Sequence, residues 1–316
     1  MAERPRGRKA QPRPKPQPKA ARPKPAQPKT WAGSEGSAPR AQRSQRSQGA
    51  PAVRSEVRGG AAAGSPIDPE LLVYGRHPVR EAARGRRKVR HVYATAAALE
   101  ELADVLPTLR AAGTELHEVA EPRELDLLAG THDHQGAVAE VTPFAYLTLE
   151  HLISTAAKAG VPPLVFCLDQ VTDPHNLGAI ARVADAAGAT GLLVPEHRSA
   201  RVTGAAVKAS AGALEHVLVA RCTNLANEIE RAKGATVWAY AATERGTRDW
   251  TDVDLAGGTL LVLGAEGPGI RPRVLSMCDE QVRIPMAGEV ASLNVATVAA
   301  VLAFEAVRQR RAAAKG

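Results

Sequence analysis

Aromatic residues, cysteines and long apolar runs are all scarce in this chain. Phe, Trp and Tyr make up only 3 % of its 316 residues, so its cores must be built from Ala, Val and Leu. The three cysteines are odd in number and show no C-x-x-C spacing, which argues against a disulfide framework or a zinc site. No apolar run approaches the roughly 18 residues of a membrane span, and the N-terminus has no apolar signal core. We expect a reduced, cytoplasmic protein with no membrane contact.

Negative charge is scarce at the N-terminal end. Residues 1–65 carry 15 Lys and Arg against three Glu, a net charge of +12, and because the whole chain is at +8, the other residues carry −4. The same stretch alternates Pro with Lys or Arg and contains one aromatic residue, Trp31. Such a composition buries too little apolar surface to fold. We predict a disordered basic tail over residues 1–68, which is either a solubilising arm or, as its charge favours, a tether for RNA.

Strand and helix signals alternate over residues 69–145, which predicts a small α/β domain. The expected strands are Leu71–Tyr74, Val89–Ala94, Glu115–Val119 and Ala137–Val141, and the expected helices are Pro78–Arg84, Ala96–Ala112 and Pro122–Leu128. Seven Lys and Arg lie between Arg76 and Arg90, as either a solvated face or an RNA contact. His132 and His134 lack a third ligand nearby, so we expect polar loop residues there and no metal site.

A linker over residues 146–162 leads into a second domain, residues 163–316. Its apolar strands are expected at Leu164–Leu168, Gly191–Val194, Val217–Ala220, Val237–Tyr240, Leu260–Leu263 and Val282–Pro285. Apolar runs separated by helices predict a mostly parallel sheet that is covered on both faces. The last helix, Leu293–Arg311, is apolar almost all round until Phe304, so it is expected to pack against the sheet or a partner subunit.

Two of these strands end in glycine-bearing loops, GAEGPG (264–269) and AGEVAS (287–292). Such turns let backbone amides approach a ligand closely. The first loop lacks the G-x-G-x-x-G order of a dinucleotide site and the Lys-Ser/Thr of a P-loop. This argues against a nucleotide-dependent dehydrogenase. The pattern still predicts a ligand-binding turn, but the spacing of the glycines does not identify the ligand.

Three further stretches carry a resemblance. NLGAIAR (176–182), LGAEGPG (263–269), and IPM (284–286) with SLN (292–294) resemble, in order and separation, the signature motifs of the SpoU/TrmH family, the RNA ribose 2′-O-methyltransferases of the SPOUT class. VYGRHPV (73–79) and HQG (134–136) resemble the family's substrate-binding domain. The resemblance covers residues 71–311. By capping preference alone, Asn176 would be a helix N-cap and Arg182 a surface arginine.

The resemblance implies an α/β SPOUT catalytic domain with a C-terminal trefoil knot, an exception among chain topologies, preceded by an L30e-like substrate-binding domain. It also implies a homodimer whose site is completed across the interface, and S-adenosylmethionine as cofactor. The cofactor residues carried over by motif are Gly264, Ile284, Met286 and Leu293.

The implied catalytic residues are Arg182, Asn176, Glu266, Ser292 and Asn294. The implied RNA-binding residues are Arg76, His77, Gln135 and Arg182. Because an arginine side chain stays charged in proteins, we expect Arg182 to hold a phosphate and stabilise developing negative charge rather than to act as a base.

The sequence therefore predicts transfer of a methyl group to a guanosine ribose of 23S rRNA. Within the class, tRNA, another rRNA site or a thiopeptide-resistance target stay open. Outside it, a non-catalytic RNA-binding factor of the same fold is the alternative, which the intact motif residues disfavour.

Overall fold

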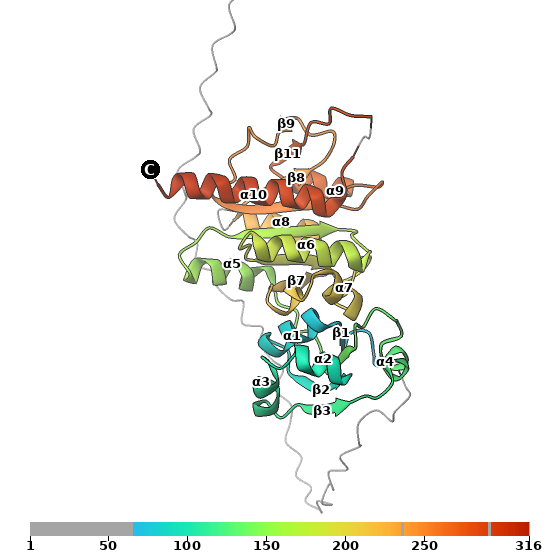
Figure 1. Ribbon diagram of the computed structural model, residues 1–316. Coiled ribbons are helices and arrows are strands. Elements are labelled where there is room, and N and C mark those ends of the chain that lie inside the picture. Colours follow the sequence, from blue (N-terminus) through green and yellow to red (C-terminus); the bar gives the residue numbers. More distant parts are fainter. Residues whose placement is uncertain (1–65, 235–236, 290–291, 316) are drawn as a thin grey trace, which may run out of the picture. The chain divides into compact units, whose positions relative to one another are not determined.

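The computed structural model describes residues 66–234, 237–289 and 292–315 (Figure 1). Residues 1–65 of the predicted disordered tail lie outside these ranges, as does the 290–291 part of the predicted second glycine loop. Among the described residues, no helix combines the length and apolarity needed to cross a bilayer.

The first domain is built on a four-stranded mixed sheet in the order β1-β4-β2-β3. The strands are β1 (Leu72–Tyr74), β2 (Val89–Ala94), β3 (Glu115–Glu118) and β4 (Ala137–Val141). β4 is antiparallel to both neighbours, whereas β2 and β3 are parallel. The helices are α1 (Arg76–Arg84), α2 (Ala96–Glu101), α3 (Leu106–Ala111) and α4 (Pro122–Ala129).

The prediction of one helix over Ala96–Ala112 is wrong, because the chain forms two short helices there. Pro107 occupies the first turn of α3. Its ring cannot donate the backbone hydrogen bond of a helix interior and would collide with the carbonyl of Ala103. A proline is tolerated only in a first turn, so α2 has to end before it.

The second domain contains a seven-stranded sheet in the order β7-β6-β5-β10-β8-β11-β9. Every pair of neighbours is parallel, as predicted. The strands are β5 (Leu164–Asp169), β6 (Gly191–Pro195), β7 (Val219–Cys222), β8 (Val237–Ala242), β9 (Arg248–Asp249), β10 (Gly258–Gly264) and β11 (Glu280–Arg283). β9 is not predicted by the sequence, because two residues leave no periodic signal.

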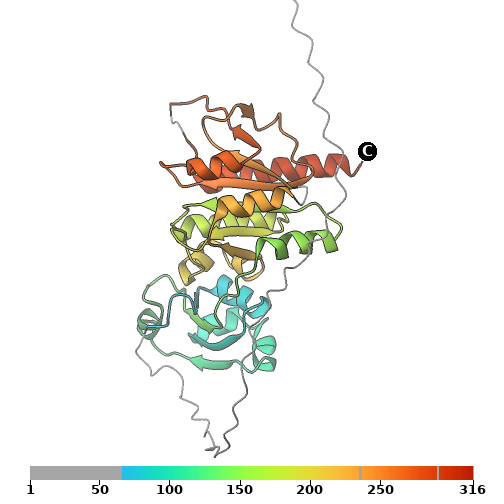
Figure 2. The ribbon, with the colours of Figure 1, turned by 180° about the vertical axis from the view of Figure 1, so that it is seen from behind.

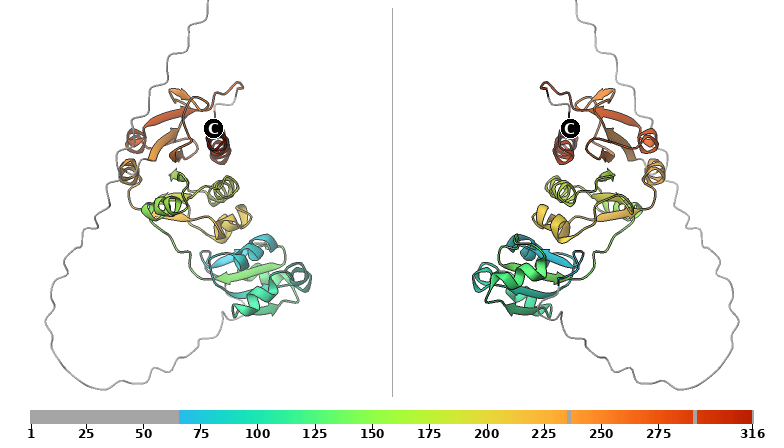
Figure 3. Two further views of the ribbon diagram at one scale, coloured as in Figure 1. Left: turned by 90° about the vertical axis from the view of Figure 1, so that its left-hand side faces the viewer. Right: turned by 90° about the vertical axis from the view of Figure 1, so that its right-hand side faces the viewer.

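Helices cover both faces of this sheet (Figure 3). One layer contains α6 (Pro174–Ala186), α7 (Gly204–Ala209) and α10 (Val295–Ala313), and the other contains α5 (Leu149–Lys158), α8 (Leu225–Lys233) and α9 (Pro272–Met277). Figure 2 shows α5 and α8 from their own side. Side chains alternate along β5, so Phe166 packs under the first layer and Cys167 under the second.

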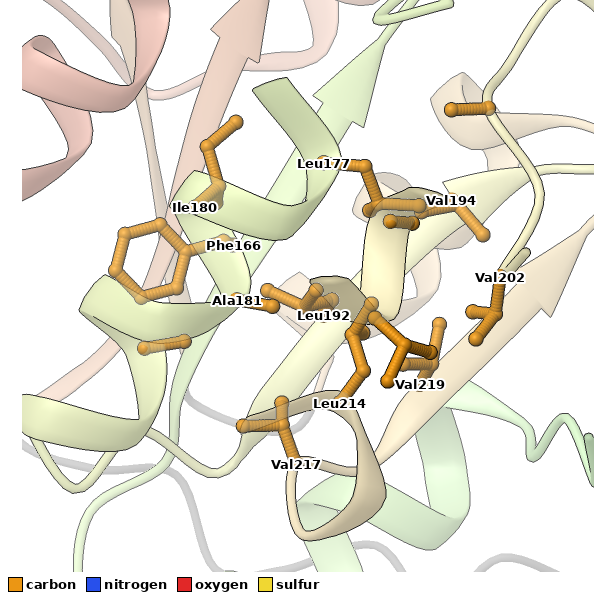
Figure 4. Close-up of a cluster of buried hydrophobic side chains, with 14 of the residues drawn as sticks. Phe166, Leu177, Ile180, Ala181, Leu192, Val194, Val202, Leu214, Val217 and Val219 are labelled. Carbon is orange, nitrogen blue, oxygen red and sulfur yellow. The ribbon is translucent and has the colours of Figure 1, made fainter. Parts of the chain in front are cut away.

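The core under α6 is made of aliphatic side chains around one aromatic ring (Figure 4). Phe166 of β5 lies against Ile180 and Ala181 of α6, while Leu192 and Val219 extend the cluster along β6 and β7. Each of these side chains is at most 1 % exposed. This packing fixes α6, which carries Asn176 in its first turn and Arg182 further along.

Asn176 is not the N-cap of α6, contrary to the sequence prediction. The helix begins at Pro174, and Asp173 caps it by accepting a hydrogen bond from the backbone N–H of His175 over 3.0 Å. Proline at the first helical position fits this arrangement, because its missing N–H would have no intrahelical partner. The side chain of Asn176 is therefore free for other bonds.

Candidate active site

A cavity of about 480 Å³ opens where β8, β10 and β11 end. Its walls are the loop 264–270 after β10, residues 243–245 after β8, Ile284 and Met286 after β11, and the start of α10 together with Ser292 and Leu293. The four residues that the family motif assigns to the cofactor, Gly264, Ile284, Met286 and Leu293, all line it, as do Glu266 and Ser292. Its volume lies within the range of about 300–1,000 Å³ that is usual for small-molecule sites.

The loop after β10 folds back on its own start. The backbone N–H of Gly269 donates to the carbonyl of Ala265 over 2.9 Å, and Gly267 and Gly269 have φ values of 83° and 69°. A Cβ atom added at Gly264 would lie 2.5 Å from the backbone N of Ile270 and 2.7 Å from the carbonyl O of Gly269. Only glycine leaves room for this return of the backbone.

An ion pair between the buried Asp169 and the partly exposed Arg271 ties this loop to β5. Asp169 is fully buried, and its carboxylate accepts from the backbone N of Arg271 over 2.7 Å, from Nε over 2.8 Å and from Nη2 over 2.7 Å. Its backbone carbonyl accepts from the N–H of Ala265 over 3.0 Å. Asp169 thus holds both ends of the loop. The sequence gives no prediction for this residue, although a carboxylate at the end of the apolar strand β5 is a signal for one.

Asn294 joins two other polar side chains, those of Glu266 in the cavity wall and of Asn176 on α6. Its Nδ2 donates to Glu266 Oε1 over 2.7 Å and to Asn176 Oδ1 over 2.9 Å, and Asn176 Nδ2 lies 3.5 Å from the same Glu266 oxygen. Its Oδ1 accepts from the backbone N of Ala296 and so caps α10. The fold thereby joins three of the five predicted catalytic residues, which lie up to 118 positions apart.

Arg182 is not part of this group. It lies on α6 with its side chain exposed, does not line the cavity, and makes no hydrogen bond or ion pair within the described part of the chain. Ser292 lines the cavity. The cavity also includes Glu244 and Arg245, which the sequence analysis misses. Their signal is that they follow β8, because ligands of open parallel sheets bind beyond the carboxyl ends of the strands.

The predicted RNA-binding residues of the first domain lie at one end of its sheet. The backbone N–H of Gly75, which precedes Arg76 and His77, donates to Ala137 O over 2.9 Å, and this brings α1 beside the turn that holds Gln135. Lys208 of α7 also approaches Gly75, since its Nζ occupies the position that a side chain there would need. Burial lowers the pKa of Lys208, an effect that the charge of Asp133 opposes and that of Arg76 reinforces.

Most of the predicted basic cluster is paired within the protein. Arg76 bonds to Glu101, Arg80 and Arg84 both reach Asp104, and the buried Arg87 pairs with the buried Glu215. These guanidinium groups offer RNA less free charge than the sequence suggests.

His134 lies in a turn, as predicted, but its side chain is buried. Its Nε2 contacts Asp126 Oδ1 over 2.9 Å and its Nδ1 accepts from the backbone N–H of Gly136 over 3.0 Å. The hydrogen bonds from His134 and then from His132 hold the pKa of the Asp126 carboxyl below its usual value. His134 therefore fixes the turn that precedes β4.

Comparison with known proteins identifies both domains. Residues 163–304 match the SpoU rRNA Methylase family, and residues 72–147 match the family domain described as RNA 2′-O ribose methyltransferase substrate binding. A 23S rRNA (guanosine-2′-O-)-methyltransferase RlmB from Pseudomonas putida is 38 % identical over 244 residues, which cover 76 % of this chain and 96 % of that protein. This chain belongs to the SpoU RNA methyltransferase family.

Two other members of the family are similar over different lengths. An RlmB protein from a Burkholderia species is 44 % identical over 192 residues, which cover 60 % of this chain and 76 % of that protein. The crystal structure of the SpoU methyltransferase AviRb from Streptomyces viridochromogenes, in complex with the cofactor AdoMet, superposes with a TM-score of 0.65 at 31 % identity, over 77 % of this chain and 91 % of that one. The predicted family and two-domain α/β fold are confirmed.

Proposed function

We propose that this protein transfers a methyl group from S-adenosylmethionine to the ribose 2′-OH of a guanosine in 23S rRNA. The observation that carries the proposal is the cavity beside the Asn176–Glu266–Asn294 group, formed by residues that belong to the motifs of a methyltransferase family. The relatives named for guanosine methylation of 23S rRNA span both domains. The proposal places the protein in the cytoplasm with its RNA.

The cavity suits the cofactor for reasons of surface chemistry. Backbone groups of the loop 264–270 and of Ile284 and Met286 line it together with apolar side chains of α10 such as Val298 and Leu302. Peptide N–H and C=O groups suit the edge of an adenine ring, and apolar side chains suit its faces. Gly264, Ile284, Met286 and Leu293 would hold the cofactor, which supplies an electrophilic methyl group on a sulfonium.

The polar group at the cavity mouth would orient the target nucleotide. The carboxylate of Glu266 accepts a hydrogen bond from the side-chain amide of Asn294, which also donates to Asn176. Each of the three side chains therefore restricts the conformation of the other two. Ser292 stands beside them at the cavity wall. Arg182 would hold a phosphate oxygen and stabilise negative charge on the ribose oxygen as its proton leaves to phosphate or solvent. Much of the rate gain would then come from alignment.

The finer features of the fold belong to the same proposal. α10 packs on α6 and β10 after the chain has passed through β11, which supports a trefoil knot at the C-terminal end. The mixed sheet of the first domain, covered by helices on both faces, supports an L30e-like domain. We retain the predicted division into residues 1–68, 69–145, 146–162 and 163–316, with the first segment as an RNA tether.

We further propose that the protein is a homodimer whose active site is shared. Phe304 on α10 is 49 % exposed although it is large and apolar, which supports an interface on this helix. A shared site also gives Arg182 a role, because it lies outside the cavity of its own subunit.

The substrate test uses tritiated S-adenosylmethionine with the purified full chain and, separately, 23S rRNA, 16S rRNA and bulk tRNA. We expect label in 23S rRNA that digests to 2′-O-methylguanosine, loss of label with Arg182→Ala at unchanged cofactor affinity, and normal labelling with Arg110→Ala, a second exposed arginine. Label in tRNA alone would keep the chemistry but refute the substrate. Cofactor binding without label on any RNA or on large ribosomal subunits would refute the enzymatic function.

The shared site is tested by co-expressing Arg182→Ala with Gly264→Ala. At a cofactor concentration well below the wild-type Kd, each variant alone should have at most about a tenth of wild-type activity. If one subunit supplies the cavity and the other supplies the arginine, half of the dimers carry one intact site, and about a quarter of wild-type activity returns. No recovery in verified heterodimers would place both residues in the same subunit.

A further inference from the structure

Three side chains able to bind a metal ion converge on the first domain, away from the cavity. His91 lies on β2, while Glu115 and His117 lie on β3. The parallel register pairs His91 with Glu115, and Glu115 and His117 share a face of the sheet because they are two positions apart. The sequence predicts no metal site here, since the two histidines are 26 positions apart and only the fold brings them together.

The distances between the three donor atoms fit a tetrahedral ion. His91 Nδ1 lies 3.3 Å from His117 Nε2, and Glu115 Oε2 lies 3.4 Å from the first nitrogen and 3.7 Å from the second. Ligands that bind Zn²⁺ at about 2.0–2.2 Å in tetrahedral geometry are about 3.3–3.6 Å apart. The three atoms therefore already occupy one face of such a tetrahedron.

Two of the three atoms are imidazole nitrogens, and an imidazole nitrogen without a proton presents a lone pair to an ion. A divalent cation would accept a lone pair from all three atoms at once and offset the charge of the Glu115 carboxylate.

The surroundings add negative charge and hold the rings in place. Glu140 of β4 is the cross-strand neighbour of His91, with Arg90 Nη1 4.0 Å from its carboxylate. The Tyr93 ring stacks on that of His117 with centroids 4.7 Å apart and planes at 14°. Because the imidazole is held by this contact, little side-chain entropy is left to lose on binding.

We propose that His91, Glu115 and His117 bind a divalent transition-metal ion, with Zn²⁺ as the physiological candidate and water as the fourth ligand. The side chain of Glu115 is 68 % exposed and that of His117 is 40 % exposed, which leaves the fourth position open to solvent. None of the three residues lines the cavity at the ends of β8, β10 and β11. The ion would join the edge strand β3 to β2 and stabilise the RNA-binding domain rather than take part in methyl transfer.

The test uses the full chain after exhaustive dialysis against EDTA, titrated with ZnCl₂ in a calorimeter and melted with and without Zn²⁺. We expect one ion per chain and a Tm that rises on adding Zn²⁺. Mutating a residue that only hydrogen-bonds to a metal ligand weakens metal affinity by about 10–100-fold. Removing a ligand itself, as in His117→Ala, should therefore weaken Zn²⁺ binding by at least about 100-fold and abolish the Tm rise.

Two more variants separate binding from folding. Glu115→Gln keeps the size of the side chain but removes its charge, and should lose Zn²⁺ affinity while its circular dichroism spectrum is unchanged. His132→Ala is the matched control, because its imidazole also contacts a carboxylate, that of Asp126, over 2.9 Å outside the proposed site, and should bind Zn²⁺ normally. The proposal would be overturned if the wild type did not bind Zn²⁺, or if His117→Ala and Glu115→Gln both bound Zn²⁺ with wild-type affinity.

Discussion

Replacing Gly264 by alanine should distort the loop that closes the cofactor cavity. The new Cβ would lie 2.5 Å from Ile270 N, 2.7 Å from Gly269 O and closer still to Gly269 C, so this stretch of backbone must move by at least about 0.5 Å to restore a tolerable 3.0 Å. All three atoms belong to the backbone, and no side-chain rotation relieves the clash. Overpacking of this kind costs about 1–3 kcal/mol. At about 2–4 °C per kcal/mol for a chain of this size, Tm should fall by about 2–12 °C.

Cofactor affinity reports the same displacement more directly. The moved atoms line the cavity, so we expect the Kd for S-adenosylmethionine, measured by calorimetry, to rise at least about tenfold, equivalent to about 1.4 kcal/mol. Gly288→Ala is the control, because a Cβ there meets no atom within 4 Å, and it should change stability by no more than about 0.5 kcal/mol. A Gly264→Ala variant with wild-type Tm and Kd would refute the assignment of this loop as a cavity wall.

Three other predictions test separate parts of the molecule. Asn294→Asp keeps the cap of α10 but replaces the amide donor with a second carboxylate beside Glu266, so methyl transfer should fall by about 100-fold with Tm within a few degrees of wild type; full activity would show that the amide is dispensable. Phe304→Glu should convert the proposed dimer to a monomer in size-exclusion light scattering, whereas a variant that stays dimeric would place the interface elsewhere. Desolvation raises the pKa of Cys222 and Cys278 to about 12, so at pH 8 a thiolate-specific reagent should label neither until guanidinium is added; rapid labelling of the folded protein would contradict the raised pKa values.

The sequence predicts those parts of the site that follow from local pattern. The apolar runs of β5 and β10 are long enough to be recognised as buried strands, and the glycines after β10 mark a close backbone turn. Parallel neighbouring strands end at the same edge of a sheet. The turn after β10 is therefore expected to lie near the turn after β5. The register agrees, since Gly264 is paired with Asp169 at the ends of the two strands.

Other parts depend on contacts between distant residues, which local pattern does not record. The bond between Arg271 and Asp169 spans 102 positions, and the pair His91–His117 is formed only by strand register. Two wrong predictions of helix starts concern features that are visible in the local sequence. Asp173 before Pro174 is a stronger helix start than Asn176, and Pro107 marks a helix start rather than an interior.

The position of Arg182 gives a physical reason to expect a shared site. It follows Asn176 by six residues on α6, which places it about 9 Å further along the axis and about 120° around it. Its side chain does not line the cavity, whereas Asn176 is joined through Asn294 to Glu266 of the cavity wall. Arg182 is nevertheless exposed and makes no bond within the described residues, so its charge is available to another molecule. A second subunit packed on the face of α10 that bears Phe304 would supply that cavity. The arginine would then need no catalytic partner within its own chain.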